Sequence, residues 1–115
     1  MVRNVSREEL KEKMDRGEEF FLVDTLEEPY FRHSHLPGAI NIPLKEIDRA
    51  EEMVPDRGAE VVVYCMDPPC ELSEKAARKL EAMGYENVRH YDGGKQDWIE
   101  AGLPAEGRRA EREGP

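Results

Sequence analysis

The chain lacks most features that mark a secreted or membrane-spanning protein. Only two of its 115 residues are cysteine, which is too few for a disulfide scaffold. Its longest apolar run is Val61-Val62-Val63-Tyr64-Cys65-Met66, which is far too short to cross a bilayer. The first residues, Met-Val-Arg-Asn-Val-Ser, contain no apolar segment of the kind that signal peptides carry. These absences predict a cytoplasmic protein.

Positive charge is also scarce. Lys and Arg total 17 against 26 Asp and Glu, which gives a net charge of −9. Without a basic stripe, we expect no binding to nucleic acid and no attachment to anionic membranes. The length fits a single globular domain, which we place at residues 1–104. Residues 105–115 have no large apolar side chain, and we expect them to form a mobile tail.

Short apolar runs alternate with helical patterns along the chain. We predict strands over residues 20–24, 39–42, 61–64 and 88–91. Helices are predicted after Ser6, over residues 27–32, after Pro43, after Ser73 as the capping residue, and after Gly94. Alternation of this kind indicates an α/β fold in three layers, with a parallel sheet flanked by helices on both faces.

Cys65 directly follows the strongest predicted strand and precedes a predicted helix. Ligands of open parallel sheets bind beyond the carboxyl ends of the strands. A thiolate at this place would face loop N–H groups and the positive end of a helix dipole. Cys65 is therefore either a nucleophile or a cysteine that merely packs. A zinc site is disfavoured because Cys65 and Cys70 are five residues apart and no second cysteine pair exists, so we expect neither metal nor organic cofactor.

Three stretches of the sequence help to decide between these two roles of Cys65. They are Leu22-Val23-Asp24 with residues 35–43, then Val62-Val63-Tyr64-Cys65 with the helix up to Gly84-Tyr85, then Asp92-Gly93-Gly94 with Trp98 and residues 102–104. In this order the chain resembles the rhodanese-like domain family of sulfurtransferases over about residues 5–104. The resemblance implies a five-stranded parallel sheet. It also implies that Cys65 carries sulfane sulfur as a persulfide, from a small-molecule or protein-bound donor to a thiol acceptor.

The loop after Cys65 departs from the usual pattern of that family, which has a glycine and an arginine before its serine. Its two prolines remove two N–H donors. Asp67 and Glu71 bring negative charge close to the sulfur, which should raise the pKa of the thiol. Leu26 stands where the family often has an arginine. We therefore expect thiosulfate to be a poor donor. The loop as a whole consists of Met66, Asp67, Pro68, Pro69, Cys70, Glu71, Leu72 and Ser73.

Cys70 has two interpretations. It is either a residue without a redox role, or a resolving thiol that attacks a persulfide or sulfenic acid on Cys65 and closes a disulfide. Two other functions accordingly stay open. One is a thiol redox module that cycles the Cys65–Cys70 pair, and the other is a non-catalytic rhodanese-like binding domain.

Three further residues match family positions near the site. Asp24 is expected to fix the loops around it. His35 is expected to bond backbone near the sheet edge, with a role as catalytic base as the alternative. Trp98 is expected to pack in the core near the pocket wall. His33 and His90 have no motif context, and we interpret both as surface residues.

Overall fold

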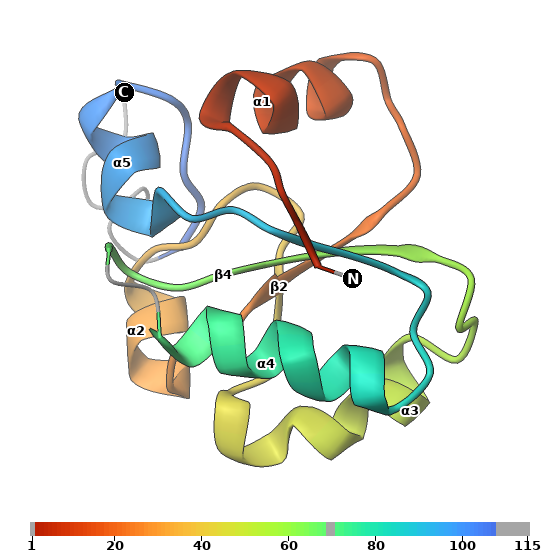
Figure 1. Ribbon diagram of the computed structural model, residues 1–115. Coiled ribbons are helices and arrows are strands. Elements are labelled where there is room, and N and C mark those ends of the chain that lie inside the picture. Colours follow the sequence, from red (N-terminus) through yellow and green to blue (C-terminus); the bar gives the residue numbers. More distant parts are fainter. Residues whose placement is uncertain (1, 69–70, 108–115) are drawn as a thin grey trace.

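The computed structural model describes residues 2–68 and 71–107 and shows a five-stranded sheet between two layers of helices (Figure 1). Neighbouring strands follow the order β1-β5-β4-β2-β3, and every neighbouring pair is parallel. The predicted α/β fold is therefore confirmed, with β4 in the centre of the sheet. The strands are β1 (Arg3–Asn4), β2 (Phe21–Asp24), β3 (Ile40–Asn41), β4 (Glu60–Tyr64) and β5 (Asn87–His90).

The helices begin close to the places that their start signals predict. Ser6 caps the first helix by a reciprocal pair of hydrogen bonds with Glu9, which is the predicted capping box. Pro43 precedes a 3-10 segment that runs on into a short α-helix, where one longer helix was predicted. The helical elements are α1 (Arg7–Asp15), α2 (Glu28–His33), η1 (Leu44–Arg49), α3 (Ala50–Met53), α4 (Glu71–Ala82) and α5 (Gly94–Glu100).

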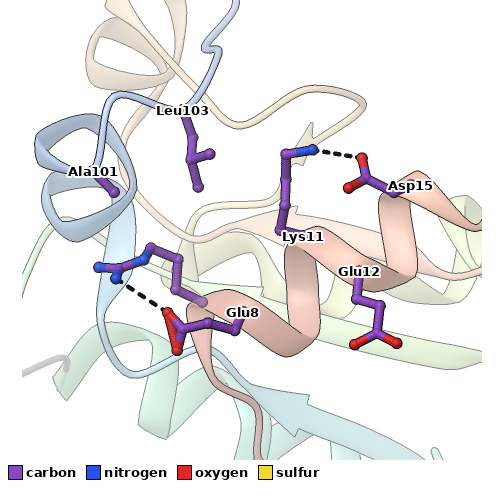
Figure 2. A pocket seen from close by; sticks show the side chains of 7 residues that line it. Glu8, Lys11, Glu12, Asp15, Ala101 and Leu103 are labelled. Carbon is purple, nitrogen blue, oxygen red and sulfur yellow. Dashed lines mark hydrogen bonds and ion pairs between the residues drawn. The ribbon is translucent and has the colours of Figure 1, made fainter.

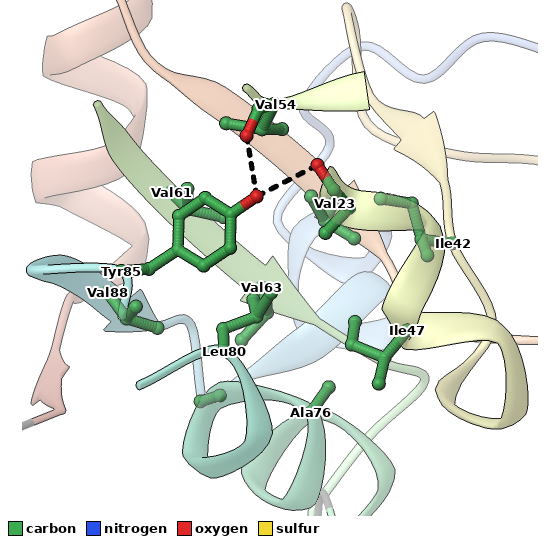
Figure 3. Close-up of a cluster of buried hydrophobic side chains, with 12 residues drawn as sticks. Val23, Ile42, Ile47, Val54, Val61, Val63, Ala76, Leu80, Tyr85 and Val88 are labelled. Atoms are coloured by element: carbon green, nitrogen blue, oxygen red, sulfur yellow. Dashed lines mark hydrogen bonds between the residues drawn. The ribbon is translucent and has the colours of Figure 1, made fainter. Parts of the chain in front are cut away.

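Successive residues of β4 face opposite layers of the molecule. Val61 and Val63 pack with side chains of η1, α3 and α4, and Figure 3 shows this cluster. Val62 and Tyr64 point the other way and pack with side chains of α1 and α5. Because both faces are covered, the central strand is apolar from Val61 to Tyr64 rather than alternating with polar residues. Two buried clusters thus pack on the two faces of β4, and this packing fixes the position of its carboxyl end.

Packing against the rest of the domain continues beyond residue 104, where the sequence predicts that the domain ends. Glu106 lies in the stretch expected to be a mobile tail, but its backbone forms an antiparallel bridge with His35. The carboxylate of Glu106 also accepts a hydrogen bond from the Gly38 amide. The packed part of the domain therefore includes residues 105–107, beyond the predicted boundary at residue 104. Residues 108–115 of the expected tail lie outside the described residues.

Candidate active site

Cys65 follows β4 at the carboxyl end of the sheet, and only 4% of its surface is exposed. The start of α5 holds its backbone. The Lys95 amide donates to the Cys65 carbonyl across 2.8 Å, and the Gln96 amide donates to the Met66 carbonyl across 2.8 Å. Gly94 has a φ of +75°, and a Cβ there would lie 2.7 Å from the Met66 carbonyl oxygen. Close approach of two backbone segments therefore requires glycine at this position.

The sulfur of Cys65 is held from α4. The Ser73 hydroxyl, which is fully buried, donates a hydrogen bond to the Cys65 Sγ across 3.3 Å. Ser73 was predicted to cap this helix, but α4 already includes Glu71, so Ser73 lies within its first turn. The prediction of a cap is therefore wrong, and the hydroxyl reaches the sulfur. A donor to the sulfur stabilises the thiolate more than the thiol and so favours the reactive form.

His90 lies next to this contact, and its interpretation as a surface residue is wrong. Its exposed fraction is 6%, and its Nε2 lies 2.6 Å from the Ser73 Oγ. Burial lowers the pKa of His90, although the charges of Asp92 and Glu74 oppose the shift. The period of two along a strand places His90 on the same face as Val88, and both are buried. That alternation was the signal in the sequence that could have identified His90 as an inward-facing residue. His33 is exposed, as predicted.

The other side of Cys65 is apolar. Leu26, which is 7% exposed, packs against Cys65 together with Met66. Asp67 and Pro68 of the following loop are exposed, and so are Glu71 and Leu72 at the start of α4. Cys65 thus has an apolar wall on this side, and exposed acidic residues follow it closely in the chain. Pro69 and Cys70 lie outside the described residues, so both interpretations of Cys70 stay predictions.

Asp24 ends β2 and organises the turn that follows. Its Oδ1 accepts a hydrogen bond from the Leu26 amide across 2.9 Å, and its backbone carbonyl accepts one from the Asn41 side chain. Burial raises the pKa of the Asp24 carboxyl, and the Leu26 amide and the charge of Lys95 oppose that shift. Because Leu26 packs on Cys65, Asp24 positions one wall of the site through the backbone.

His35 and Trp98 make their contacts elsewhere. The Nδ1 of His35 lies 2.8 Å from the Phe31 carbonyl oxygen, and its ring stacks on the Phe31 ring. Trp98 is fully buried in the cluster that β4 shares with α1 and α5, and its Nε1 donates to the Pro104 carbonyl. His35 therefore contacts α2, and Trp98 holds the chain that follows α5.

A separate hollow of about 450 Å³ lies between α1 and the chain after α5 (Figure 2). Four of its charged lining residues pair with one another, since Lys11 binds Asp15 and Arg7 binds Glu8. Within residues 2–68 and 71–107, no group of three or more His, Cys, Asp or Glu side chains is arranged to hold a metal ion. No helix in the same ranges is long and apolar enough to cross a membrane.

The model of the rhodanese-like domain matches residues 6–101, and the chain belongs to that family. The rhodanese-like domain of the Alr3790 protein from Anabaena sp. superposes with a TM-score of 0.86 at 26% identity, covering 97% of this chain and 84% of that one. The resemblance drawn from the three sequence stretches is thereby confirmed.

Curated relatives of different kinds share this domain. A protein named "Sulfurtransferase" from Allochromatium vinosum is 30% identical over 105 residues, covering 90% of this chain and 94% of that protein. The "HTH-type transcriptional regulator Rv0324" from Mycobacterium tuberculosis is 37% identical over 103 residues, covering 89% of this chain and 44% of that protein. The chain spans about half or less of the length of the first curated relatives that it matches.

Proposed function

We propose that the protein is a sulfurtransferase that carries sulfane sulfur as a persulfide on Cys65. The observation that carries the proposal is the setting of the sulfur. Cys65 lies at the carboxyl end of the central strand, and the buried Ser73 hydroxyl donates to its Sγ. The family membership and the Allochromatium relative named "Sulfurtransferase" support the same reaction.

The proposed reaction needs no oxidant, reductant or metal. The Cys65 thiolate attacks the sulfane sulfur of a donor, the donor S–S bond breaks, and the rest of the donor leaves as an anion. Cys65 then carries a persulfide. An acceptor thiolate attacks the outer sulfur of that persulfide, the new S–S bond breaks, and Cys65 returns as a thiolate. A cytoplasmic location would supply the reduced thiols that accept the sulfur.

The walls of the site favour donors without a negative charge. An incoming dianion such as thiosulfate would meet the apolar side chains of Leu26 and Met66 on one side. It would also meet the exposed carboxylates of Asp67 and Glu71. Each charge-assisted contact that an arginine would have made is worth about 1.5–3 kcal/mol. We therefore propose that thiosulfate is a poor donor, and that neutral or protein-bound sulfur donors are better ones.

Mass spectrometry of the intact protein tests the proposal. The parent protein, Cys65→Ser and the matched control Cys70→Ser are each incubated with polysulfide, and the mass and the release of sulfur to a thiol are measured. We expect the parent and Cys70→Ser to gain one sulfur atom and pass it on, and Cys65→Ser to do neither. Sulfur transfer by Cys65→Ser at the parental rate would move the nucleophile to Cys70.

The same spectra separate the two alternative functions. Loss of two hydrogens from the parent without any gain of sulfur indicates a redox module that closes a Cys65–Cys70 disulfide. An unchanged mass with every sulfane donor indicates a binding domain. Either result contradicts the proposed sulfur transfer. Steady-state rates with thiosulfate and with an uncharged sulfane-sulfur donor then test the donor preference, and equal rates would contradict it.

A further inference from the structure

We propose that His90 is a positioning residue for Cys65, and that it acts through Ser73 in a hydrogen-bond relay that stabilises the anionic sulfur. The relay is defined by three atoms, which are Cys65 Sγ, Ser73 Oγ and His90 Nε2. The role of the relay in sulfur transfer rests on the proposed function. The two contacts that form the relay are features of the structure and do not depend on it.

The proton order along the relay follows from the anionic sulfur. A thiolate can only accept, so the single proton of the Ser73 hydroxyl is donated to the Cys65 sulfur across 3.3 Å. The oxygen of the same hydroxyl lies 2.6 Å from His90 Nε2, and the proposed relay requires the tautomer of His90 in which Nε2 donates to it. All three side chains are buried, which strengthens each contact relative to one in water.

The surroundings of His90 allow it to exchange protons with solvent. The imidazole borders a cavity of about 320 Å³. The charged groups that line this cavity are Glu74 and Arg78 from α4 and Asp92 from the turn after β5, while β1 contributes the neutral Asn4. Burial lowers the pKa of His90, and Glu74 and Asp92 oppose that shift. The neutral form therefore dominates at neutral pH, and an added proton would strengthen the donor that faces Ser73.

The relay reaches the sulfur atom on which charge appears in the second half of the reaction. When an acceptor thiolate takes the outer sulfur of the persulfide, the S–S bond breaks and its electron pair stays on Cys65 Sγ. A lower pKa of the leaving thiol speeds such exchange. The Ser73 hydroxyl donates to this inner sulfur. The relay therefore serves release of the carried sulfur as well as formation of the initial thiolate.

The relay also explains how the anionic sulfur of Cys65 is stabilised although the loop that follows it is unfavourable for an anion. Pro68 and Pro69 cannot donate N–H groups to an anion, and Asp67 and Glu71 disfavour one by their charge. The two groups of the relay, the Ser73 hydroxyl and the His90 imidazole, belong to α4 and β5 instead. They can stabilise the sulfur without relying on the loop amides.

A double-mutant cycle on the reactivity of the thiol tests this proposal. The background is Cys70→Ser, which leaves Cys65 as the single cysteine. In this background Ser73→Ala, His90→Phe and the double variant are compared, and His90→Gln retains an N–H group near the place of Nε2. The rate of alkylation by iodoacetamide is measured against pH, and thermal melting checks that each variant folds.

We expect Ser73→Ala and His90→Phe each to raise the apparent pKa of the thiol and to slow alkylation at neutral pH about tenfold. His90→Gln should keep most of the parental rate. His90→Phe should have little further effect once Ser73 is alanine, because the two residues act in series. Fully additive effects, or a His90→Phe profile that superposes on the parental one, would overturn the relay. Alkylation does not depend on sulfur transfer, so failure here is distinct from failure of the proposed function.

Discussion

Cys65 is held from two sides that differ in kind. On the side-chain side, the Ser73 hydroxyl donates a hydrogen bond to the sulfur, and His90 contacts Ser73 in turn. On the backbone side, the amides of Lys95 and Gln96 bind the carbonyl groups of Cys65 and Met66. The first side sets the charge of the sulfur, and the second sets where the sulfur is. Reactivity and position should therefore respond to different substitutions.

The largest effect is expected on the backbone side, from Gly94→Ala. The new Cβ would lie 2.7 Å from the Met66 carbonyl oxygen and 2.9 Å from the Cys65 carbonyl oxygen, so one backbone segment must move. The positive φ adds about 1–2 kcal/mol of strain. We expect the free energy of unfolding to fall by more than about 3 kcal/mol, and the two hydrogen bonds to Cys65 and Met66 to weaken. Urea denaturation measures the first effect, and amide exchange at Lys95 measures the second.

Gly102→Ala is the matched control for that variant. Gly102 has nearly the same positive φ, but a Cβ there would meet nothing within 4 Å. It should therefore cost only the conformational strain of about 1–2 kcal/mol and leave amide exchange at Lys95 unchanged. Equal losses of stability in the two variants would show that close approach to the Cys65 backbone contributes nothing.

Lys95→Met tests whether stability on the backbone side can change without a change in reactivity. The buried Nζ of Lys95 donates to the carbonyl groups of Tyr30 and Ser34 and so ties α5 to α2. Methionine keeps the length of the side chain but leaves these acceptors without that donor, at a cost of about 1–3 kcal/mol. The bond from the Lys95 amide to Cys65 remains. The alkylation rate of Cys65 should accordingly stay within about twofold of the parental rate.

Lys11→Met is the control for the loss of stability expected in Lys95→Met. Lys11 pairs with Asp15 on the surface of α1, where an exposed ion pair is worth less than about 1 kcal/mol. Its melting temperature should stay close to the parental value, well above that of Lys95→Met. A tenfold change in Cys65 alkylation in Lys95→Met would mean that the two sides of Cys65 are not separable.

The sequence predicts the backbone side better than the side-chain side, for a physical reason. The close approach at Gly94 needs a glycine, and Gly93-Gly94 is visible in the sequence as a motif. The apolar runs of β2 and β4 were equally visible because both faces of these strands are buried. In each case one short stretch contains the whole signal.

No single stretch of the sequence signals the relay: alternation along β5 points to a buried His90 but not to its contact with Ser73. Ser73 was assigned to a helix cap because Ser often starts helices, and only the beginning of α4 at or before Glu71 shows that it lies inside the helix. His90 comes from another element and meets Ser73 only after α4 has packed on β5. The two-residue strand β1 was also missed, since Arg3 and Asn4 are exposed and pair with β5 through the backbone alone.

His90→Gln should remove a specific part of the dependence of stability on pH. The pKa of His90 is below 6.5 in the folded protein, so the unfolded chain binds more protons between the folded value and 6.5. Parental stability therefore rises with pH through this window and is lost as pH falls. Urea denaturation at several values between about pH 5 and pH 7 should show a shallower rise in His90→Gln.

The raised pKa of Asp24 acts with the opposite sign. Its contribution is present at low pH and is lost as pH rises through the folded value, and it is common to both proteins. The difference between the two stability curves therefore isolates His90. Parallel curves for the parent and His90→Gln would indicate that the imidazole titrates as it does in the unfolded chain.

The smallest effect is expected from Glu74→Gln, which changes the charge beside the relay and leaves its contacts in place. The Glu74 carboxylate raises the pKa of His90, so its removal should lower that pKa further, as seen by NMR titration of the imidazole. Glu74 also pairs with Arg78 on the surface of α4, and loss of that exposed pair should change stability by no more than about 0.5 kcal/mol. Glu12→Gln removes an equivalent pair with Arg16 on α1, which packs on the opposite face of the sheet from α4. It should leave the His90 titration unchanged, and equal shifts in the two variants would mean that His90 responds to net charge rather than to its neighbour.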